Sequence, residues 1–211
     1  MEFKPPIKQY FYALFLPVAL ILLFVLQNQA FNIWLGIASS SYALRLFAVS
    51  FALGIVIYGP SLLFNKKGKY IYLFLISFLV SLIFVSQFLY YRYSESFLGI
   101  SAIKYMGQAP SIAGTAKSLL TPELLIFSSN VFLVLAAFLL TFRKDYKEFS
   151  PPKWEKIIVV LLMALIVFLG YKFLLDTEKK EWGNTSRLYK DVYDLNALVG
   201  KMGIINFLIE D

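Results

Sequence analysis

Long apolar blocks separated by short polar stretches dominate the pattern of this chain. A helix needs about 20 consecutive apolar residues to cross a hydrocarbon layer of about 30 Å, and several blocks reach that length. The clearest polar stretch between two blocks is NKKGK, at residues 65–69. The pattern predicts an all-α integral membrane protein with five transmembrane helices and short amphipathic helices on the outer face. The predicted spans cover residues 10–27, 41–64, 70–91, 122–142 and 154–175.

Composition agrees with the membrane assignment. Hydrophobic residues make up 59% of the 211 positions and charged residues 16%, whereas soluble domains are about half apolar and about a quarter charged. Cysteine and histidine are both absent, which excludes disulfides and removes the commonest general base and nitrogen ligand. The net charge of +7 favours an anionic lipid surface or serves only to orient the spans. We expect membrane lipids, and no nucleic acid, as partners.

The first span has two interpretations, an uncleaved anchor or a cleaved signal peptide. Its apolar run is long for a signal peptide, and NQA before Phe31 lacks a small residue three places before a cut. The anchor is therefore favoured. Pro17 lies inside this span and is expected to kink it.

Lysine and arginine counts predict the orientation of the spans. The N-terminal segment holds two of these residues, the 65–69 turn three and the 143–156 loop five. The alternate segments hold none at 28–40 and three across 92–121. We therefore expect a cytoplasmic N-terminus and, after five spans, an extracellular juxtamembrane segment at 176–211.

Cations on the predicted outer face are the candidates for contact with a lipid phosphate. Phe97, Ile100, Ile103 and Met106 recur at helical spacing, which indicates a helix lying along the outer leaflet within an interfacial loop at 92–121. That helix either caps the bundle or forms a lateral headgroup site. The candidate headgroup-binding residues are Arg45, Tyr91, Arg92, Lys104 and Lys117. For Arg45 the alternative is simple snorkelling to the interface.

A second amphipathic stretch follows the last span. Leu188, Val192, Leu195 and Val199 share one helical face, and Gly200 is expected to end the helix.

Several short motifs resemble the membrane half of the lipoteichoic acid synthases, which are bacterial phosphoglycerol transferases. The stretches YYRYSES, MGQ and AKSLLTPELLIF are followed, one span later, by DLNALVGKMGIINFLIED. The family's tyrosine–arginine–aromatic motif is matched by Tyr91, Arg92 and Tyr93. Its later glutamine and serine correspond to Gln108 and Ser118, which adds Gln108 to the candidate site. Its C-terminal pattern is matched by Leu198, Val199, Gly203, Asn206, Phe207 and Asp211.

The resemblance implies a role in a larger enzyme of the Gram-positive cell envelope. The family carries a sulfatase-like extracellular catalytic domain with a threonine nucleophile and a manganese ion, which would follow residue 211. These 211 residues have no histidine, so we expect them alone to hold no metal and to catalyse nothing. Glu95 departs from the family's usual aspartate.

The leading hypothesis is therefore a membrane domain that anchors the catalytic domain and presents phosphatidylglycerol. Expected partners are that lipid, the sulfatase-like domain of the same polypeptide, and other envelope proteins. The alternative is a stand-alone membrane interaction or regulatory protein without activity. An intramembrane enzyme is disfavoured, because the spans hold no acid beyond Glu123 and Glu155 at helix starts.

Overall fold

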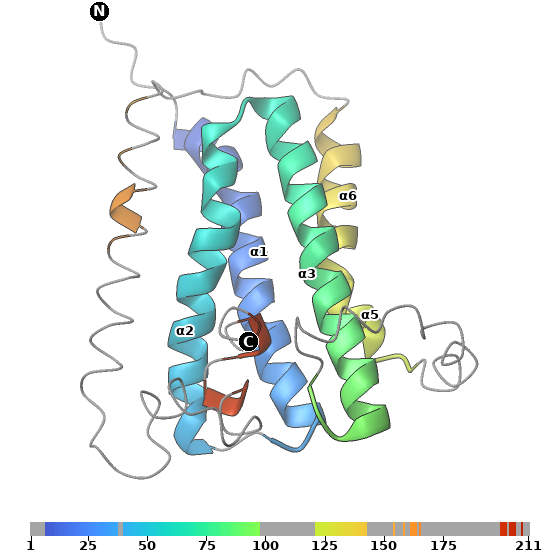
Figure 1. Cartoon of the computed structure of the whole chain (residues 1–211). Helices are drawn as coiled ribbons and strands as arrows, with labels where there is room; N and C mark the ends of the chain where they lie inside the picture. The colour runs from blue at the N-terminus through green and yellow to red at the C-terminus, as the bar shows by residue number, and fades with distance from the viewer. Residues whose placement is uncertain are drawn as a thin grey trace, which may run out of the picture.

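A computed structural model describes residues 7–37, 40–97 and 121–142, with single residues and short runs between 154 and 165 and between 199 and 208. Within these ranges every regular element is a helix, which confirms the predicted all-α class. The elements are α1 (Ile7–Trp34), α2 (Ser40–Tyr58), the 3-10 helix η1 (Gly59–Leu63), α3 (Lys66–Ser94), α5 (Leu124–Phe127) and α6 (Ser129–Phe142) (Figure 1).

Three helical stretches are long and apolar enough to cross a membrane: Leu14–Trp34, Ala43–Leu63 and Lys66–Ser94. They correspond to the first three predicted spans. The apolar part of α6, Ser129–Leu140, is shorter. Most of the predicted fifth span, 154–175, lies outside the described residues, so the number of five spans stays a prediction.

Helix α1 is the central element of the bundle. It packs against α2, α3 and α6, and it lies behind and between α2 and α3 in Figure 1. Its Leu20, Phe24 and Phe31 are fully buried. Cleavage after this helix would remove the middle of the core, which supports the anchor interpretation over the signal peptide.

The first predicted span is too short, because α1 continues past Gln27 to Trp34. Polar residues there indicated a loop, yet Gln27, Asn28 and Asn32 are buried inside the bundle. The Asn28 and Asn32 amides each donate to a backbone carbonyl one turn earlier, that of Phe24 at 3.1 Å and that of Asn28 at 3.2 Å. Their side-chain NH₂ groups are thus bonded within the helix, so the helix continues.

The fourth predicted span is not one helix. Ser128 separates α5 from α6, although the apolar pattern over 122–142 indicated a continuous helix. The Gln27 side chain of α1 donates to the carbonyls of Ile126, at 2.8 Å, and Phe127, at 3.3 Å. Backbone carbonyls inside a membrane must be bonded by the protein itself. The break is tolerated because Gln27 supplies donors to it.

The hairpin between α2 and α3 is tight, as the NKKGK turn predicted. Asn65 caps α3, and its side chain accepts a hydrogen bond from the Gly68 amide at 3.0 Å. At the other end of α3, Glu95 has a left-handed backbone with φ of 54°, and its amide donates to the Tyr91 carbonyl at 2.8 Å. This cap turns the chain sharply away from the end of the helix.

The surface of the helices is apolar. Leu44 is 80% exposed and Leu139 68%, and many other large hydrophobic side chains along α1, α2, α3 and α6 are similarly exposed. Such a surface is unstable in water but is matched by lipid tails. The chain is therefore a membrane protein.

Replacing Gln27 by leucine is expected to destabilise the fold by about 1–3 kcal/mol, because the carbonyls of Ile126 and Phe127 would each lose the hydrogen bond from Gln27 inside an apolar medium. The free energy of unfolding in detergent measures the loss. Gln29→Leu is the matched control, since the Gln29 amide makes one exposed hydrogen bond, to the Ala43 carbonyl. Equal stability of the two variants would contradict the role given to Gln27.

Candidate functional site

The structure brings three segments together at one end of the bundle. Helix α1 ends there, α2 begins there and α3 ends there, and the described C-terminal residues lie at the same end (Figure 1). Of the predicted site residues, Arg45, Tyr91 and Arg92 are described and belong to this end. Lys104, Gln108 and Lys117 lie outside the described residues.

Arg92 lies in the last turn of α3 with an exposed side chain. Its guanidinium carbon is 5.5 Å from the centroid of the Phe88 ring, a cation–π contact that restrains the side chain without neutralising it. The charge of Arg92 also reaches Glu123, which precedes α5. The pKa of the Glu123 carboxyl is lowered by the Thr121 side chain, by its own backbone amide and by the nearby Arg92. Arg92 therefore already has an acidic neighbour.

Tyr91 is part of an aromatic cluster and not a freely presented side chain. Its ring centroid is 4.8 Å from that of Phe97, and Phe97 lies 6.2 Å from Phe31 in the core. Phe97 is only 6% exposed. The prediction that Phe97 lies on a helix along the leaflet is therefore wrong for this residue, because the left-handed turn at Glu95 directs the chain back over the bundle.

Aromatic rings fill the core beneath Arg92. Phe127 of α5 stacks on Phe84 at 5.5 Å between centroids and meets Phe88 at 5.2 Å and Phe31 at 5.7 Å. Edge-to-face and offset ring pairs add to simple burial. This cluster fixes the end of α3 against α1 and α5, so the position of Arg92 is set by rigid neighbours.

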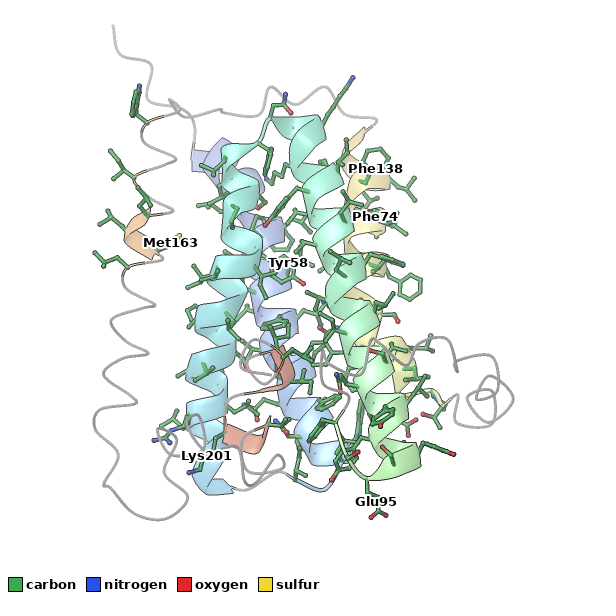
Figure 2. All side chains as sticks on the ribbon, viewed as in Figure 1. Tyr58, Phe74, Glu95, Phe138, Met163 and Lys201 are labelled. Atoms are coloured by element: carbon green, nitrogen blue, oxygen red, sulfur yellow. The ribbon has the colours of Figure 1, made fainter. Side chains whose placement is uncertain are left out.

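The C-terminal segment is seated in the bundle. Val199, Lys201, Gly203 and Ile204 are buried, and Figure 2 shows Lys201 beside the start of α2. Gly203 has φ of +81°, and a Cβ atom there would lie 2.8 Å from Asn28 Oδ1 and 3.4 Å from Leu46 Cδ1. The segment thus approaches α1 and α2 as closely as only glycine allows.

The helix stop expected at Gly200 is wrong by one turn. Val199, Gly200 and Lys201 are all helical. The left-handed glycine is Gly203, whose amide donates to the Val199 carbonyl at 2.8 Å. This is the bond of an αL cap. Two glycines lie close together in the sequence, and only the contact with Asn28 decides which of them ends the helix.

Carboxylates are sparse in the described part of the chain. Glu95 and Glu123 lie at the end that carries Arg92, and no three metal-ligating side chains gather within the described ranges. The manganese ion implied by the resemblance remains an expectation for a domain outside these residues.

A family profile for the lipoteichoic acid synthase N-terminal domain matches residues 2–211. The chain belongs to this family. The resemblance drawn from Tyr91, Arg92, Tyr93 and the motif around Gly203 is thereby confirmed.

Two curated relatives of this N-terminal domain come from Bacillus subtilis (strain 168). Lipoteichoic acid synthase 2 is 26% identical over 212 residues, which cover 99% of this chain and 31% of the relative. Lipoteichoic acid synthase 1 is 22% identical over 177 residues, which cover 84% of this chain and 26% of the relative. The chain thus spans less than a third of the length of these relatives. No solved structure matches it.

Sequence reasoning missed the amide residues of this N-terminal domain. Gln27, Asn28 and Asn32 were assigned to the end of a span and a loop. In the structure Gln27 bonds to α5 and α6, Asn28 lies against the C-terminal segment, and Asn32 bonds to the Asn28 carbonyl of α1. Their signal was present in the sequence, because residues 28 and 32 are one helical turn apart and share a face.

Gly203→Ala is expected to loosen the C-terminal segment of the lipoteichoic acid synthase N-terminal domain. An L side chain in the left-handed region costs about 1–2 kcal/mol, and the added Cβ would also collide with Asn28. Hydrogen exchange of the segment around Val199 measures the loosening.

Gly36→Ala is the control for this variant. Gly36 has φ of +71° and nothing within 4 Å of an added Cβ, so it carries the backbone cost without the collision. Adding Asn28→Ala to Gly203→Ala should recover part of the protection. Equal exchange in the Gly36 and Gly203 variants would refute the close contact with Asn28.

Proposed function

We propose that this chain is the membrane domain of a lipoteichoic acid synthase-like phosphoglycerol transferase. It anchors an extracellular catalytic domain and presents phosphatidylglycerol to it for synthesis of a glycerol-phosphate polymer. The observation that carries the proposal is that the C-terminal segment packs into the bundle. Gly203 lies against Asn28 and Leu46, at the end of the bundle that carries Arg92.

Anchoring is supported by the burial of the C-terminal segment in the bundle. Val199 and Ile204 are 0% exposed, so these two residues belong to the core and are not part of a loose tether. A domain that follows such a segment starts from a fixed point beside α1 and α2. A flexible tether would allow it to move far from the membrane surface, whereas a buried segment keeps it near the lipid headgroups.

Presentation of the lipid is supported by the chemistry of Arg92. A guanidinium offers a planar fork of donors that suits phosphate oxygens. Arg92 is exposed, rests on Phe88 and lies in the last turn of an apolar helix, which is the depth at which a headgroup phosphate is found. Arg45, near the start of α2 at the same end, adds a second positive charge.

The orientation follows from the positive-inside rule. Three lysines flank the start of α3 in the NKKGK turn, so that end faces the cytoplasm and the Arg92 end faces outward. Lys104, Gln108 and Lys117 would add to the outer site. Manganese and the threonine nucleophile would belong to the sulfatase-like domain of the same polypeptide, and other envelope proteins are further partners of the assembly.

In the full-length enzyme, Arg92→Gln is expected to lower polymer output and the amount of phosphatidylglycerol retained on the purified protein, each several-fold, because one phosphate contact is lost. Arg92→Lys should recover part of the polymer output and part of the lipid retention, since lysine restores the positive charge but not the planar fork of donors. Phosphatidylcholine with the same chains serves as the neutral control. Unchanged output and unchanged retention in Arg92→Gln would refute lipid presentation.

Glu123→Gln is expected to act in the opposite direction and raise phosphatidylglycerol retention, because it removes a negative charge whose field reaches Arg92. The lowered pKa of Glu123 means that its carboxylate stays charged at neutral pH, so the variant differs from the wild type there. As the pH falls through that pKa the wild-type carboxyl becomes neutral, and the difference should disappear. A titration of lipid retention against pH in both proteins measures this.

A further inference from the structure

Two side-chain amide oxygens inside the bundle have no hydrogen-bond donor among the residues that the structure describes. They are Oε1 of Gln27, in α1, and Oδ1 of Asn130, in α6, and both residues are 0% exposed. A buried polar atom without a partner is costly, and it is most costly in a membrane interior, which bulk water does not reach. Both oxygens therefore point to a donor that the described side chains do not supply.

The two amides lie in one region of the bundle. The Gln27 amide nitrogen is 3.3 Å from the Ser129 hydroxyl oxygen, and Ser129 directly precedes Asn130 in α6. The Asn130 amide nitrogen donates to the Tyr58 hydroxyl at 3.1 Å. The Tyr58 ring meets the Phe24 ring edge to face at 6.3 Å, and Phe24 precedes Gln27 by three residues on the same face of α1. These contacts lead from α1 through α6 and α2 back to α1.

A hydroxyl group of α3 faces the same region. Ser81 is 5% exposed, and its Oγ has no partner within the described part of the chain. It precedes Phe84 by three residues, so the two side chains share one face of α3. Phe84 meets Phe24 at 5.9 Å between ring centroids and stacks on Phe127 at 5.5 Å, which places that face against α1 and α5. Figure 2 labels Tyr58, which marks this region between α2 and α3.

Reversing an amide does not provide the missing partner. The Gln27 nitrogen has to face the Ile126 carbonyl oxygen, 2.8 Å away, because two oxygens at that distance would repel each other. The Asn130 amide can be reversed, since the Tyr58 hydroxyl can both donate and accept. Reversal would pair Oδ1 of Asn130 and leave its NH₂ group unpaired. In either orientation one polar group of Asn130 needs a further partner.

A water molecule satisfies these groups better than any other occupant. Water can donate to an amide oxygen on each side and still accept from a serine hydroxyl, and buried waters in proteins make about three such hydrogen bonds. An alkyl chain has no donor. Calcium or magnesium takes at least six oxygen ligands, usually with carboxylates among them, whereas the polar groups here are neutral.

We propose that one internal water molecule is bound between α1, α3 and α6. It donates to Oε1 of Gln27 and Oδ1 of Asn130, and it accepts from the Ser81 hydroxyl. The Gln27 amide thus bonds the end of α5 through its nitrogen and the first turn of α6, by way of the water, through its oxygen. The site lies inside the bundle and is independent of the lipid presentation proposed above.

Nuclear magnetic resonance of the purified chain in lipid nanodiscs tests the proposal. Selective nitrogen-15 labelling of asparagine and glutamine makes the side-chain NH₂ protons visible, and cross peaks to the water signal report a bound water. Peaks that change sign between laboratory-frame and rotating-frame experiments come from proximity and not from proton exchange. Such peaks are expected at Gln27 and Asn130. The internal control is Asn28, whose NH₂ group donates to the Phe24 carbonyl at 3.1 Å and should show no such peak.

Serine variants of α3 supply a matched pair. Ser81→Ala should reduce the water cross peaks of Gln27 and Asn130 several-fold, because the water loses one of its partners. Ser86→Ala should leave them unchanged, since the Ser86 hydroxyl donates to the Ile83 carbonyl at 3.0 Å.

Asn130→Leu removes the amide on the α6 side of the water and should abolish the cross peak at Gln27. If this variant fails to fold, the serine pair still tests the site, because Ser81→Ala is a smaller change.

Three outcomes would overturn the proposal. Absence of water cross peaks at Gln27 and Asn130 would show that no water is bound there. Peaks of equal strength at Asn28 would show general hydration of the bundle in place of a defined site. An unchanged Gln27 peak in Asn130→Leu, or unchanged peaks in Ser81→Ala, would show that the water does not bridge these helices.

Discussion

The hydrogen bonds of the Gln27 side chain, in the middle of the bundle, join α1 to the break between α5 and α6. Gln27 of α1 is 0% exposed, and its amide bonds the carbonyls at the break between α5 and α6. In a hydrocarbon medium an unbonded carbonyl costs several kcal/mol. The hydrogen bonds from Gln27 therefore stabilise the break together with the Ser129 hydroxyl, which also donates to the Ile126 carbonyl. Helix α1 both packs at the centre of the fold and supports this break.

The same stretch of α1 organises the end of the bundle that carries the candidate site. One residue further on, Asn28 faces Gly203, so α1 receives the C-terminal segment next to the point where it supports α5. Phe31 then meets Phe127 and Phe84 in the aromatic cluster below Arg92. Three residues of α1, Gln27, Asn28 and Phe31, thus position the helix break, the C-terminal segment and the aromatic cluster below Arg92 relative to one another.

The two ends of the bundle differ in chemistry. At one end the exposed Arg92 rests on Phe88 and lies close enough to Glu123 to lower the pKa of its carboxyl. At the other end the NKKGK turn places three lysines at the start of α3.

Local features of the sequence sufficed for the membrane class, the family and the tight hairpin. Apolar length alone determines whether a helix can cross a bilayer, and the motif around Tyr91, Arg92 and Tyr93 identifies the family without any knowledge of packing. The Asn65 cap and the lysines of the turn likewise act over a few residues. These features could be predicted because each depends only on residues that are close together in the sequence.

Contacts between distant residues decided the rest. Gln27 and Ile126 are 99 positions apart, and nothing within 122–142 marks the break that Gln27 supports. Gly200 and Gly203 look equivalent as helix stops until Asn28 is placed beside one of them. By itself the sequence determined which segments are helices in a membrane, since hydrophobic length is a local property. Only the tertiary structure decided where α1 ends, where α5 breaks and where the C-terminal segment sits, because each depends on a polar partner from another helix in a medium without water.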